Sequence, residues 1–325
     1  MKRFLVTGSA GQLGSELVPA LRERYGADNV VAAGHRTPLT EEVIDTGPTT
    51  AVDVTDVDSI DRAIRTYEID SLYHLGSVLS VTAEAHRGLS HQVNIIGLLN
   101  VLEAASENKL ERVIIPSSIA AFGLDTPHDN TPNDTLQRPN SLYGISKVFG
   151  ELMGNYYFEK LGLDVRGVRL PGVVSWKVEP TGGTTDYAVA AFYGAIHHQR
   201  YTCYLKPGTY LPMMYVPDAI LAMIQVAEAD LSNLKHHADF NVNSMSFAPE
   251  ELAEAIQSRI PEFTMEYEVD PLRQAIADSW PNSLDDAAAR QEWGWQPEYG
   301  IDAMVEDMHE NLSRKLGYGP AGKAQ

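Results

Sequence analysis

The feature that most constrains the fold is a glycine-rich turn close to the start of the sequence. Residues 3–7 form a short apolar run typical of a β-strand, residues 8–14 read Gly-Ser-Ala-Gly-Gln-Leu-Gly, and an amphipathic helical pattern follows to about residue 25. The spacing is GxxGxxG. We expect Gly8 to permit a tight turn, Gly11 to let the backbone approach a pyrophosphate, and Gly14 to let the helix pack on the strand. This strand, turn and helix predict a dinucleotide site whose phosphates lie at the helix N-terminus beside Gln12 and Leu13.

The end of the second predicted strand bears on the choice of dinucleotide. Residues 29–33 should reach the adenosine ribose, and Gly34-His35-Arg36 follow where an acidic residue normally accepts the ribose hydroxyls. A glycine followed by Arg36 is the kind of tip that can accept a 2′-phosphate instead, so the sequence leaves NAD and NADP open here. Asp53, at the end of a third strand over residues 51–54, is expected near the adenine, with a capping role as the alternative.

The order of elements predicts the fold class. Further strands are expected at residues 71–75, 112–116 and 164–170, with helical patterns between them. Such alternation predicts an α/β, Rossmann-type doubly wound parallel sheet that binds ligands beyond the carboxyl ends of its strands. After residue 172 the alternation loosens. We therefore predict a dinucleotide-binding domain over residues 1–172, with sheet contributions from about 211–245, and a smaller, mainly substrate-binding lobe over residues 173–325.

A tyrosine and a lysine four residues apart suggest chemistry. On a helix, Tyr143 and Lys147 share a face, so the ammonium can stabilise the ionised phenol and make Tyr143 a proton acceptor. The alternative is an ordinary surface pair, because this spacing is common in helices. Ser117 and Ser118 come at the end of the strand over residues 112–116, which places hydroxyl groups at the same edge of the sheet.

Composition excludes several classes of protein. A net charge of −19 repels nucleic-acid backbones, and no run of 18 apolar residues predicts a membrane span. The beginning of the sequence lacks the pattern of a signal peptide, so we expect a cytoplasmic protein. The single cysteine, Cys203, has no neighbouring ligands that would indicate a metal site.

These motifs, in this order, resemble the extended short-chain dehydrogenase/reductases over essentially the whole chain. The resemblance implies that Tyr143 is the catalytic base, that Lys147 lowers its pKa and holds the nicotinamide ribose, and that Ser118, five residues before Gly123, hydrogen-bonds the substrate oxygen. Ser117 is the competing candidate for that hydroxyl. The resemblance also implies a homodimer built through the helices that follow Leu89 and Tyr143. The predicted cofactor-binding residues are Gly8, Gly11, Gln12, Leu13, Gly14, Arg36, Asp53, Val54, Leu75, Gly76, Asn94, Tyr143, Lys147 and Pro171.

Within that family, residues 79–84, 182–189 and 211–218 are similar to the short-chain type of L-threonine 3-dehydrogenase. This similarity implies oxidation of L-threonine at C3 to 2-amino-3-ketobutyrate, with NAD as the cofactor. Ser80, Thr184 and Thr185 would then supply donors to the substrate carboxylate, although the Gly182-Gly183-Thr184-Thr185 run also fits a simple turn. The sequence departs from that pattern at Gly34, where an acidic residue is usual, and at Ser118, where threonine is common.

Two other functions remain open at this point. A nucleotide-sugar epimerase or dehydratase would share every cofactor residue, but its substrate diphosphate calls for cations, and residues 173–220 contain only Lys177, Arg200 and Lys206. A non-catalytic dinucleotide-sensing protein would have no need of Tyr143, Lys147 and Ser118.

Overall fold

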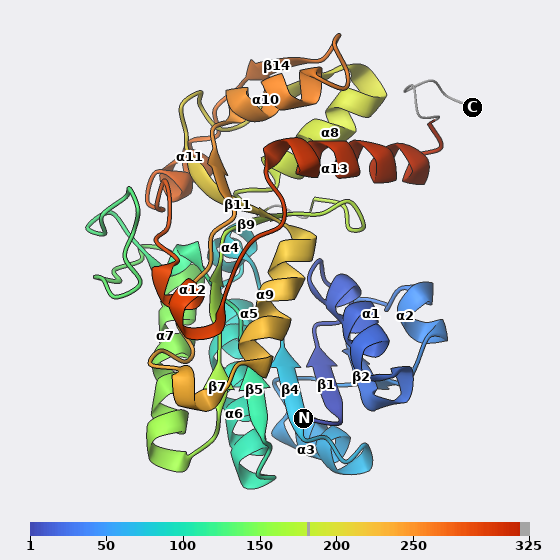
Figure 1. The fold of residues 1–325 in the computed structure, drawn as a ribbon, viewed down its shortest axis with the longest axis vertical. Coiled ribbons are helices and arrows are strands. Elements are labelled where there is room, and N and C mark those ends of the chain that lie inside the picture. The colour runs from blue at the N-terminus through green and yellow to red at the C-terminus, as the bar shows by residue number, and fades with distance from the viewer. Residues whose placement is uncertain (181–182, 319–325) are drawn as a thin grey trace.

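The computed structural model describes residues 1–180 and 183–318, and its centre is a six-stranded parallel sheet (Figure 1). The strand order is β3-β2-β1-β4-β5-β7. The strands are β1 (Phe4–Thr7), β2 (Val30–Gly34), β3 (Thr49–Ala51), β4 (Ser71–His74), β5 (Arg112–Ile114) and β7 (Val165–Arg166). The order reverses direction at β1, so the edge between β1 and β4 is where a doubly wound sheet opens a crevice for a ligand.

Helices cover both faces of this sheet, which explains why its strands are almost entirely apolar. Alternate residues of β1 point to opposite faces: Phe4 and Val6 pack in one core, and Leu5 in the other. The first core includes α1 (Gly14–Tyr25) and α9 (Val216–Glu228), and the second includes α3 (Val57–Thr66) and α6 (Leu98–Glu107). The predicted Rossmann-type fold class is confirmed.

Two strands of the sheet break at the edge where the site lies. The sequence predicts single strands over residues 112–116 and 164–170, but the first continues as β6 (Ser117–Ser118) and the second as β8 (Val168–Leu170). The break before β8 lies at Gly167, where a Cβ atom would come within 2.4 Å of the Ile115 carbonyl oxygen. β6 and β8 join β12 (Phe240–Asn241) in a separate three-stranded sheet. Beyond these breaks the two strands remain neighbours, because Ser117 pairs with Arg169 and Ser118 with Leu170.

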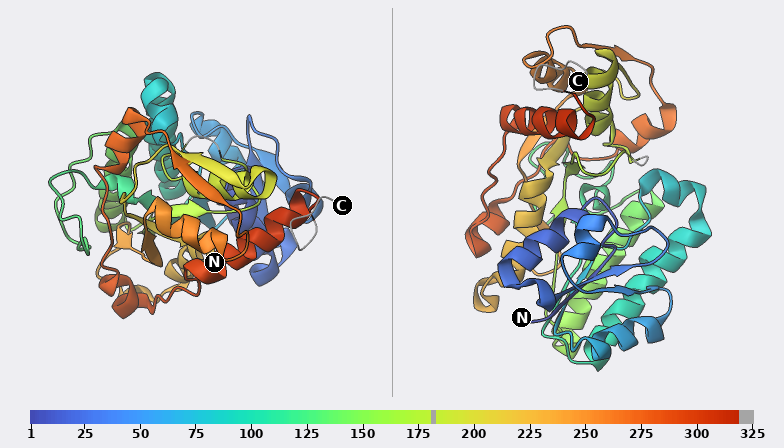
Figure 2. Two further views of the ribbon diagram at one scale, coloured as in Figure 1. Left: turned by 90° about the horizontal axis from the view of Figure 1, so that it is seen from above. Right: turned by 90° about the vertical axis from the view of Figure 1, so that its right-hand side faces the viewer.

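A smaller lobe lies over this edge (Figures 1 and 2). It contains three helices, α8 (Tyr187–His198), α10 (Pro249–Gln257) and α13 (Ile301–Lys315), and the parallel pair β10 (Arg200–Cys203) and β14 (Thr264–Tyr267). Between lobe and sheet, β9 (Gly172–Val174) pairs with β11 (Leu211–Tyr215), which pairs with β13 (Met245–Phe247). α11 (Pro271–Ala277) and α12 (Ala287–Trp293) complete the C-terminal half.

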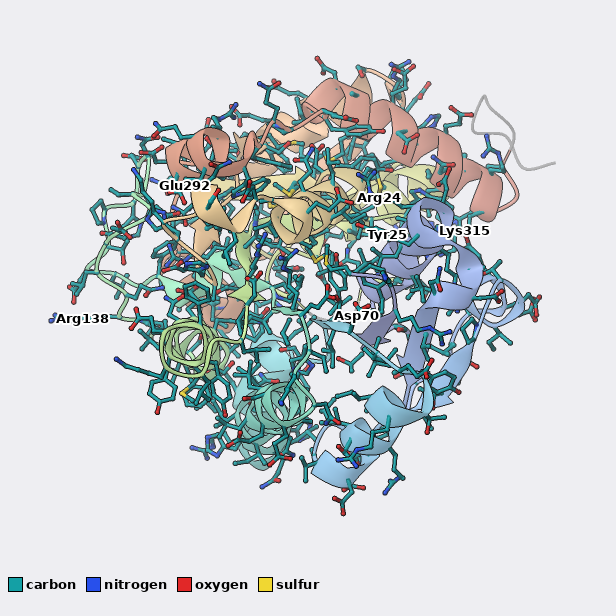
Figure 3. All side chains as sticks on the ribbon, turned by 60° about the horizontal axis from the view of Figure 1, so that its bottom comes forward. Arg24, Tyr25, Asp70, Arg138, Glu292 and Lys315 are labelled. Carbon is teal, nitrogen blue, oxygen red and sulfur yellow. The ribbon has the colours of Figure 1, made fainter. Side chains whose placement is uncertain are left out.

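Ion pairs fix neighbouring parts of the fold. Arg24 and Tyr25 lie at the end of α1 (Figure 3). Arg24 pairs with Glu228 of α9 at 2.6 Å, and the Tyr25 hydroxyl donates to the same carboxylate. In the segment after β9, the Lys177 ammonium lies 3.1 Å from Glu16 and 3.2 Å from Glu42. Because this segment leads directly to residues 183–186, these pairs help to set the position of one wall of the site.

Some short helices were not expected from the sequence. The Pro- and Thr-rich residues 37–49 contain α2 (Glu41–Asp45), whose first turn is capped by the Thr40 hydroxyl. The polar stretch after β4 contains α4 (Ser80–Ala85) and α5 (Arg87–Ser90), followed by a π-helical turn, His91–Gly97. Among residues 1–180 and 183–318, the structure contains no helix that is long and apolar enough to cross a membrane.

Candidate active site

Close packing brings the Tyr143 helix against the strand end that carries Ser118. This helix, α7 (Leu142–Tyr156), begins at Ser141, whose hydroxyl accepts a hydrogen bond from the Gly144 N–H at 3.1 Å. A Cβ atom at Gly144 would lie 2.1 Å from the Ala120 carbonyl oxygen, so only glycine allows the approach. Ala120 belongs to a single 3-10 turn, Ile119–Ala121, that directly follows Ser118. The contact therefore sets the distance between the predicted base and the predicted hydroxyl.

Tyr143, Lys147 and Ser118 lie together, as the sequence predicts. The Lys147 ammonium is 5.2 Å from the centre of the Tyr143 ring and donates a hydrogen bond to the Pro116 carbonyl oxygen at 2.8 Å. The hydroxyl of Ser118 accepts a hydrogen bond from the Ala120 N–H at 3.2 Å and is a hydrogen-bonding neighbour of the Tyr143 phenol. All three side chains line one cavity.

Burial acts against the charged form of both side chains of the pair. Burial raises the pKa of Tyr143 to about 12, and the hydrogen bond with Ser118 acts in the opposite direction. Burial lowers the pKa of Lys147 to about 8, while the Glu151 carboxylate acts to raise it. With a pKa of about 8, Lys147 is still mostly charged near neutral pH, and its ammonium lies 5.2 Å from the centre of the Tyr143 ring. Burial nevertheless holds the pKa of Tyr143 above its ordinary value, so ionisation of the phenol calls for further positive charge.

The two adjacent serines face different surroundings. Ser117 is buried and donates a hydrogen bond to Glu151, which also forms a two-pronged ion pair with Arg169 at 2.8 and 2.9 Å. Ser118 is partly exposed and lies beside Tyr143. Since the side chain of Ser117 is already engaged away from Tyr143, the geometry favours Ser118 as the hydroxyl that contacts a substrate.

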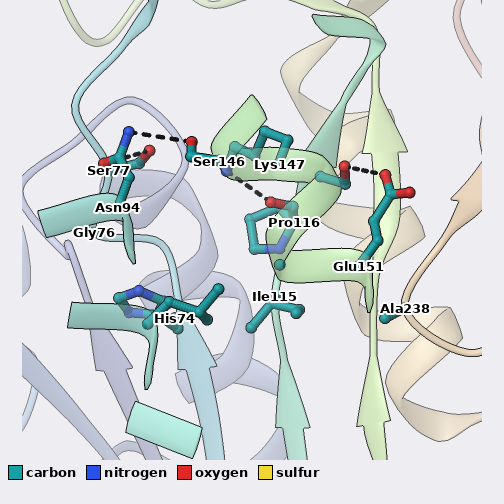
Figure 4. Close-up of a pocket in the computed structure, with 13 residues that line it drawn as sticks. His74, Gly76, Ser77, Asn94, Ile115, Pro116, Ser146, Lys147, Glu151 and Ala238 are labelled. Atoms are coloured by element: carbon teal, nitrogen blue, oxygen red, sulfur yellow. Dashed lines mark hydrogen bonds between the residues drawn. The ribbon is translucent and has the colours of Figure 1, made fainter. Parts of the chain in front are cut away.

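Asn94 ties the end of β4 to the Tyr143 helix. Its side chain accepts a hydrogen bond from the Val78 N–H at 2.8 Å and donates to the Val78 carbonyl oxygen at 2.9 Å and to Ser146 at 3.4 Å (Figure 4). With Lys147 and Glu151 it lines a cavity of about 30 Å³, which is large enough to hold a water molecule. Asn94 thus holds the segment that follows β4, and it does not line either of the two larger cavities described below.

The predicted substrate residues share a cavity with the predicted catalytic residues. This cavity has a volume of about 140 Å³ and is lined by Ser80, Thr184 and Thr185 as well as Ser118 and Tyr143. The hydroxyl oxygens of Ser80 and Thr184, which are distant in sequence, are 3.4 Å apart. The Tyr204 hydroxyl holds the loop by donating to the Gly183 and Thr184 carbonyl oxygens at 3.1 and 3.2 Å. Gly182 lies outside the described residues.

Other residues of this cavity were not predicted. Asp186 accepts a hydrogen bond from the Gly183 N–H at 2.9 Å and is the only carboxylate among the described lining residues, and Lys147 is their only cation. Its position directly after Thr184-Thr185 was a usable signal. Trp280 also lines the cavity, from almost 100 residues further along the chain, and no local pattern marks it. Gln12, Leu13, Leu75 and Pro171, predicted as cofactor residues, border the same space.

The glycine turn has the geometry that a dinucleotide requires. Gly8 has a φ of +74°, and a Cβ atom there would lie 2.7 Å from the Gly76 nitrogen. A Cβ at Gly14 would lie 2.3 Å from the Gly8 carbonyl oxygen. Within the described residues, the backbone N–H groups of Gln12 and Leu13 donate no hydrogen bond, so they are free to bind an anion at the start of α1. The turn therefore fits a pyrophosphate.

A second cavity of about 550 Å³ extends from this turn to the tip of β2. Its lining includes the predicted residues Gly8, Gly11, Arg36, Asp53, Val54, Leu75 and Gly76. Asp53 lines this cavity and accepts hydrogen bonds from the Thr55 N–H and hydroxyl at 2.9 and 2.7 Å, whereas the helix that follows is capped by Asp56. These bonds hold the pKa of its carboxyl below the ordinary value.

The parallel sheet, the glycine turn and the Tyr143–Lys147 pair together define an oxidoreductase of the extended short-chain dehydrogenase/reductase class. The family model of the NAD dependent epimerase/dehydratase family matches residues 4–242, and the chain belongs to that family. An epimerase/dehydratase of Staphylococcus aureus, named as uncharacterized, is 46% identical over 315 residues, which cover 97% of this chain and 98% of the relative.

Among solved structures, the chain is similar to L-threonine dehydrogenases. The L-threonine dehydrogenase of Clostridium difficile superimposes with a TM-score of 0.95 at 47% identity, over 98% of this chain and 99% of that one. The L-threonine dehydrogenase of Phytophthora infestans superimposes with a TM-score of 0.92 at 44% identity, over 97% of this chain and all (100%) of that one.

Proposed function

We propose that this protein oxidises L-threonine at C3 to 2-amino-3-ketobutyrate and transfers the hydride to NAD. The observation that carries the proposal is the 140 Å³ cavity that joins Ser118, Tyr143 and Lys147 to Ser80, Thr184 and Thr185. The similarity to solved L-threonine dehydrogenases supports the choice of substrate.

Each catalytic residue has a separate role in this proposal. Ser118 hydrogen-bonds the C3 oxygen of the substrate, and Tyr143, as tyrosinate, removes the proton of that hydroxyl. Bound nicotinamide would accept the hydride from C3 and add a positive charge beside the phenol. Lys147 holds the nicotinamide ribose and completes the cationic surroundings of Tyr143. Because burial raises the pKa of Tyr143 to about 12 in the protein alone, tyrosinate formation depends on charge brought in by the cofactor.

Recognition of a zwitterionic amino acid follows from the polar groups of the cavity. The hydroxyls of Ser80, Thr184 and Thr185 donate to the substrate carboxylate. Asp186 carries the charge that would balance the substrate ammonium group. A substrate held at both ends presents its C3 hydroxyl in one orientation, which is the orientation that hydride transfer requires.

A nucleotide-sugar substrate fits this cavity less well. The volume of about 140 Å³ suits a small amino acid, and no arginine lies among its described lining residues to pair with a diphosphate. A purely sensing protein would not place Tyr143, Lys147 and Ser118 around one point.

The test is a substrate panel followed by the absorbance of reduced cofactor. L-threonine, allo-threonine, serine and UDP-glucose are each supplied with NAD and with NADP. We expect L-threonine to give the highest kcat/KM. A signal with UDP-glucose alone, or with none of the four compounds, contradicts the proposal.

A further inference from the structure

The structure points to a 2′-phosphate subsite at the adenosine end of the dinucleotide cavity. We infer that Arg36 is the principal ligand of this phosphate, so that the chain binds NADP at least as tightly as NAD. The inference rests on the proposed dinucleotide site and names the form of the cofactor that its adenosine end accepts.

The tip of β2 carries no group that would bind the ribose hydroxyls and repel a phosphate. Gly34 occupies this tip, and its carbonyl oxygen accepts a hydrogen bond from the Val52 N–H at 2.9 Å, which fixes it against β3. The Leu39 side chain lies beside it, since a Cβ atom at Gly34 would come within 3.1 Å of Leu39 Cγ. A neutral, narrow strand end therefore faces the ribose. In a dinucleotide fold the carboxylate expected here selects the free 2′-hydroxyl, and its absence removes that selection.

Arg36 provides a cation where that carboxylate is missing. Its side chain is exposed and lines the cavity, and within the described residues it forms no ion pair and no hydrogen bond. Other guanidinium groups of this half of the fold are engaged. Arg62 lies 3.6 Å from Asp56, and Arg65 lies 2.9 Å from Asp61. An uncommitted, planar guanidinium at the edge of a dinucleotide cavity is suited to two-pronged contact with a phosphate.

The single carboxylate among the described lining residues, Asp53, is turned toward partners of its own. One oxygen accepts both hydrogen bonds from Thr55, and the other lies 3.6 Å from His35 Nε2. The His35 and Arg36 side chains both act electrostatically on this carboxyl group. Thr37 lines the cavity next to Arg36 and offers a further hydroxyl donor. Arg36 and the hydroxyl donor of Thr37 thus stand against one negative group at this end, and one oxygen of that group is already held by Thr55.

Calorimetric titration with NAD and with NADP, without any substrate, tests the inference through binding alone. For the wild-type protein we expect NADP to bind at least as tightly as NAD. Arg36→Gln should weaken NADP by about tenfold, because it removes a charge-assisted contact, and should change NAD by no more than about twofold. Arg62→Gln is the matched control and should leave the ratio of the two affinities unchanged.

A second pair of variants examines the strand tip. Gly34→Asp restores the carboxylate and should reverse the preference toward NAD, whereas Gly34→Ala adds the Cβ atom without the charge and should keep the wild-type ratio. The inference is overturned if wild-type protein binds NAD more tightly than NADP, if neither dinucleotide binds, or if Arg36→Gln leaves the ratio unchanged. Tight NADP binding without turnover of L-threonine would sustain the subsite and contradict only the proposed function.

Discussion

The Lys147 ammonium donates a hydrogen bond to the carbonyl oxygen of Pro116 at 2.8 Å, and Pro116 lies two residues before Ser118. This bond joins α7 to the strand end that carries the candidate hydroxyl. A carbonyl oxygen accepts a stronger hydrogen bond from a charged ammonium than from a neutral amine. This hydrogen bond therefore favours the charged form of Lys147, whereas burial favours the neutral form. The orientation of the lysine relative to Tyr143 is therefore fixed by backbone that precedes the site.

Replacing Tyr143 by phenylalanine should remove the base while leaving the cavity almost unchanged. We expect kcat with L-threonine to fall by at least about a thousandfold, within the range of general acid–base catalysis. Binding of the dinucleotide, measured by calorimetry, should persist. Tyr156→Phe, an exposed change on the same helix, is the control. Unchanged turnover in Tyr143→Phe would refute the role of Tyr143.

Alanine variants of the two serines should have different effects, one on catalysis and the other on stability. Ser118→Ala should lower kcat by about a hundredfold, because the substrate oxygen loses a preorganised partner. Ser117→Ala should keep most of the activity but lower the free energy of unfolding by about 1–3 kcal/mol, because the buried Glu151 carboxylate loses a donor. Steady-state kinetics and urea unfolding of both variants distinguish these effects, and the reverse pattern would assign the catalytic hydroxyl to Ser117.

Glu151→Gln should leave the buried Arg169 charge unpaired. Removing one partner of a buried ion pair costs about 3–5 kcal/mol of unfolding free energy. The same change removes the charge that acts to raise the pKa of Lys147, so the pKa of Lys147 should fall below about 8. Urea unfolding and the pH profile of kcat measure the two effects. Glu159→Gln, at an exposed site just beyond α7, should change neither.

Acid sensitivity should depend on His74. Its ring, buried and joined by Nδ1 to the Thr7 hydroxyl at 2.8 Å, has a pKa lowered to about 3, chiefly by burial and also by Lys147. Between the unfolded-state pKa of 6.5 and about 3, the unfolded chain binds a proton that the folded protein does not. The contribution of His74 to the free energy of unfolding is therefore highest above pH 6.5, and it falls by about 1.4 kcal/mol per pH unit below that pH.

Replacing His74 by asparagine should remove this contribution. The unfolding free energies of wild type and His74→Asn should approach one another by about 2 kcal/mol between pH 7 and pH 5, as measured in urea. A difference that stays constant with pH would show that His74 takes up its proton in the folded state.

Exposed apolar residues on neighbouring helical segments support the expected homodimer. They include Ile96 at 40%, Ile145 at 50% and Leu152 at 61% exposure. We expect light scattering after gel filtration to give the mass of two chains, and Leu152→Glu to give the mass of one. Leu124→Glu, at a 63% exposed site outside α7, is the control and should remain dimeric. A wild-type mass of one chain would contradict the expectation.

Local pattern was sufficient to predict the core of the fold and the placement of Lys147 beside Tyr143. The turn at Gly8 and the spacing of Tyr143 and Lys147 each occupy a few consecutive residues, so their geometry follows from the strand or helix that holds them. The break at Gly167 did not follow in this way, because it arises from the approach of Ile115 and of Ala238, which is distant in sequence.

The remaining features depended on contacts between distant segments. Trp280 reaches the substrate cavity only through the arrangement of the C-terminal lobe. Ser117 is bonded to Glu151 and Ser118 lies beside Tyr143, and both contacts join segments that are apart in the sequence. No sequence motif marks Glu151. The pKa of Tyr143 likewise depends on burial, which a helical spacing does not report.

β8 gains its partner β12 only late in synthesis of the chain. Val168 pairs with Phe240, and the strand order places β8 between β6 and β12. A ribosome must therefore add the residues between them before that side of β8 is covered, and until then the nascent chain presents an open strand edge next to Ser118. Such an edge can pair with other chains. The site matures only when most of the polypeptide has left the ribosome, so truncated products that end before residue 240 should be prone to aggregate.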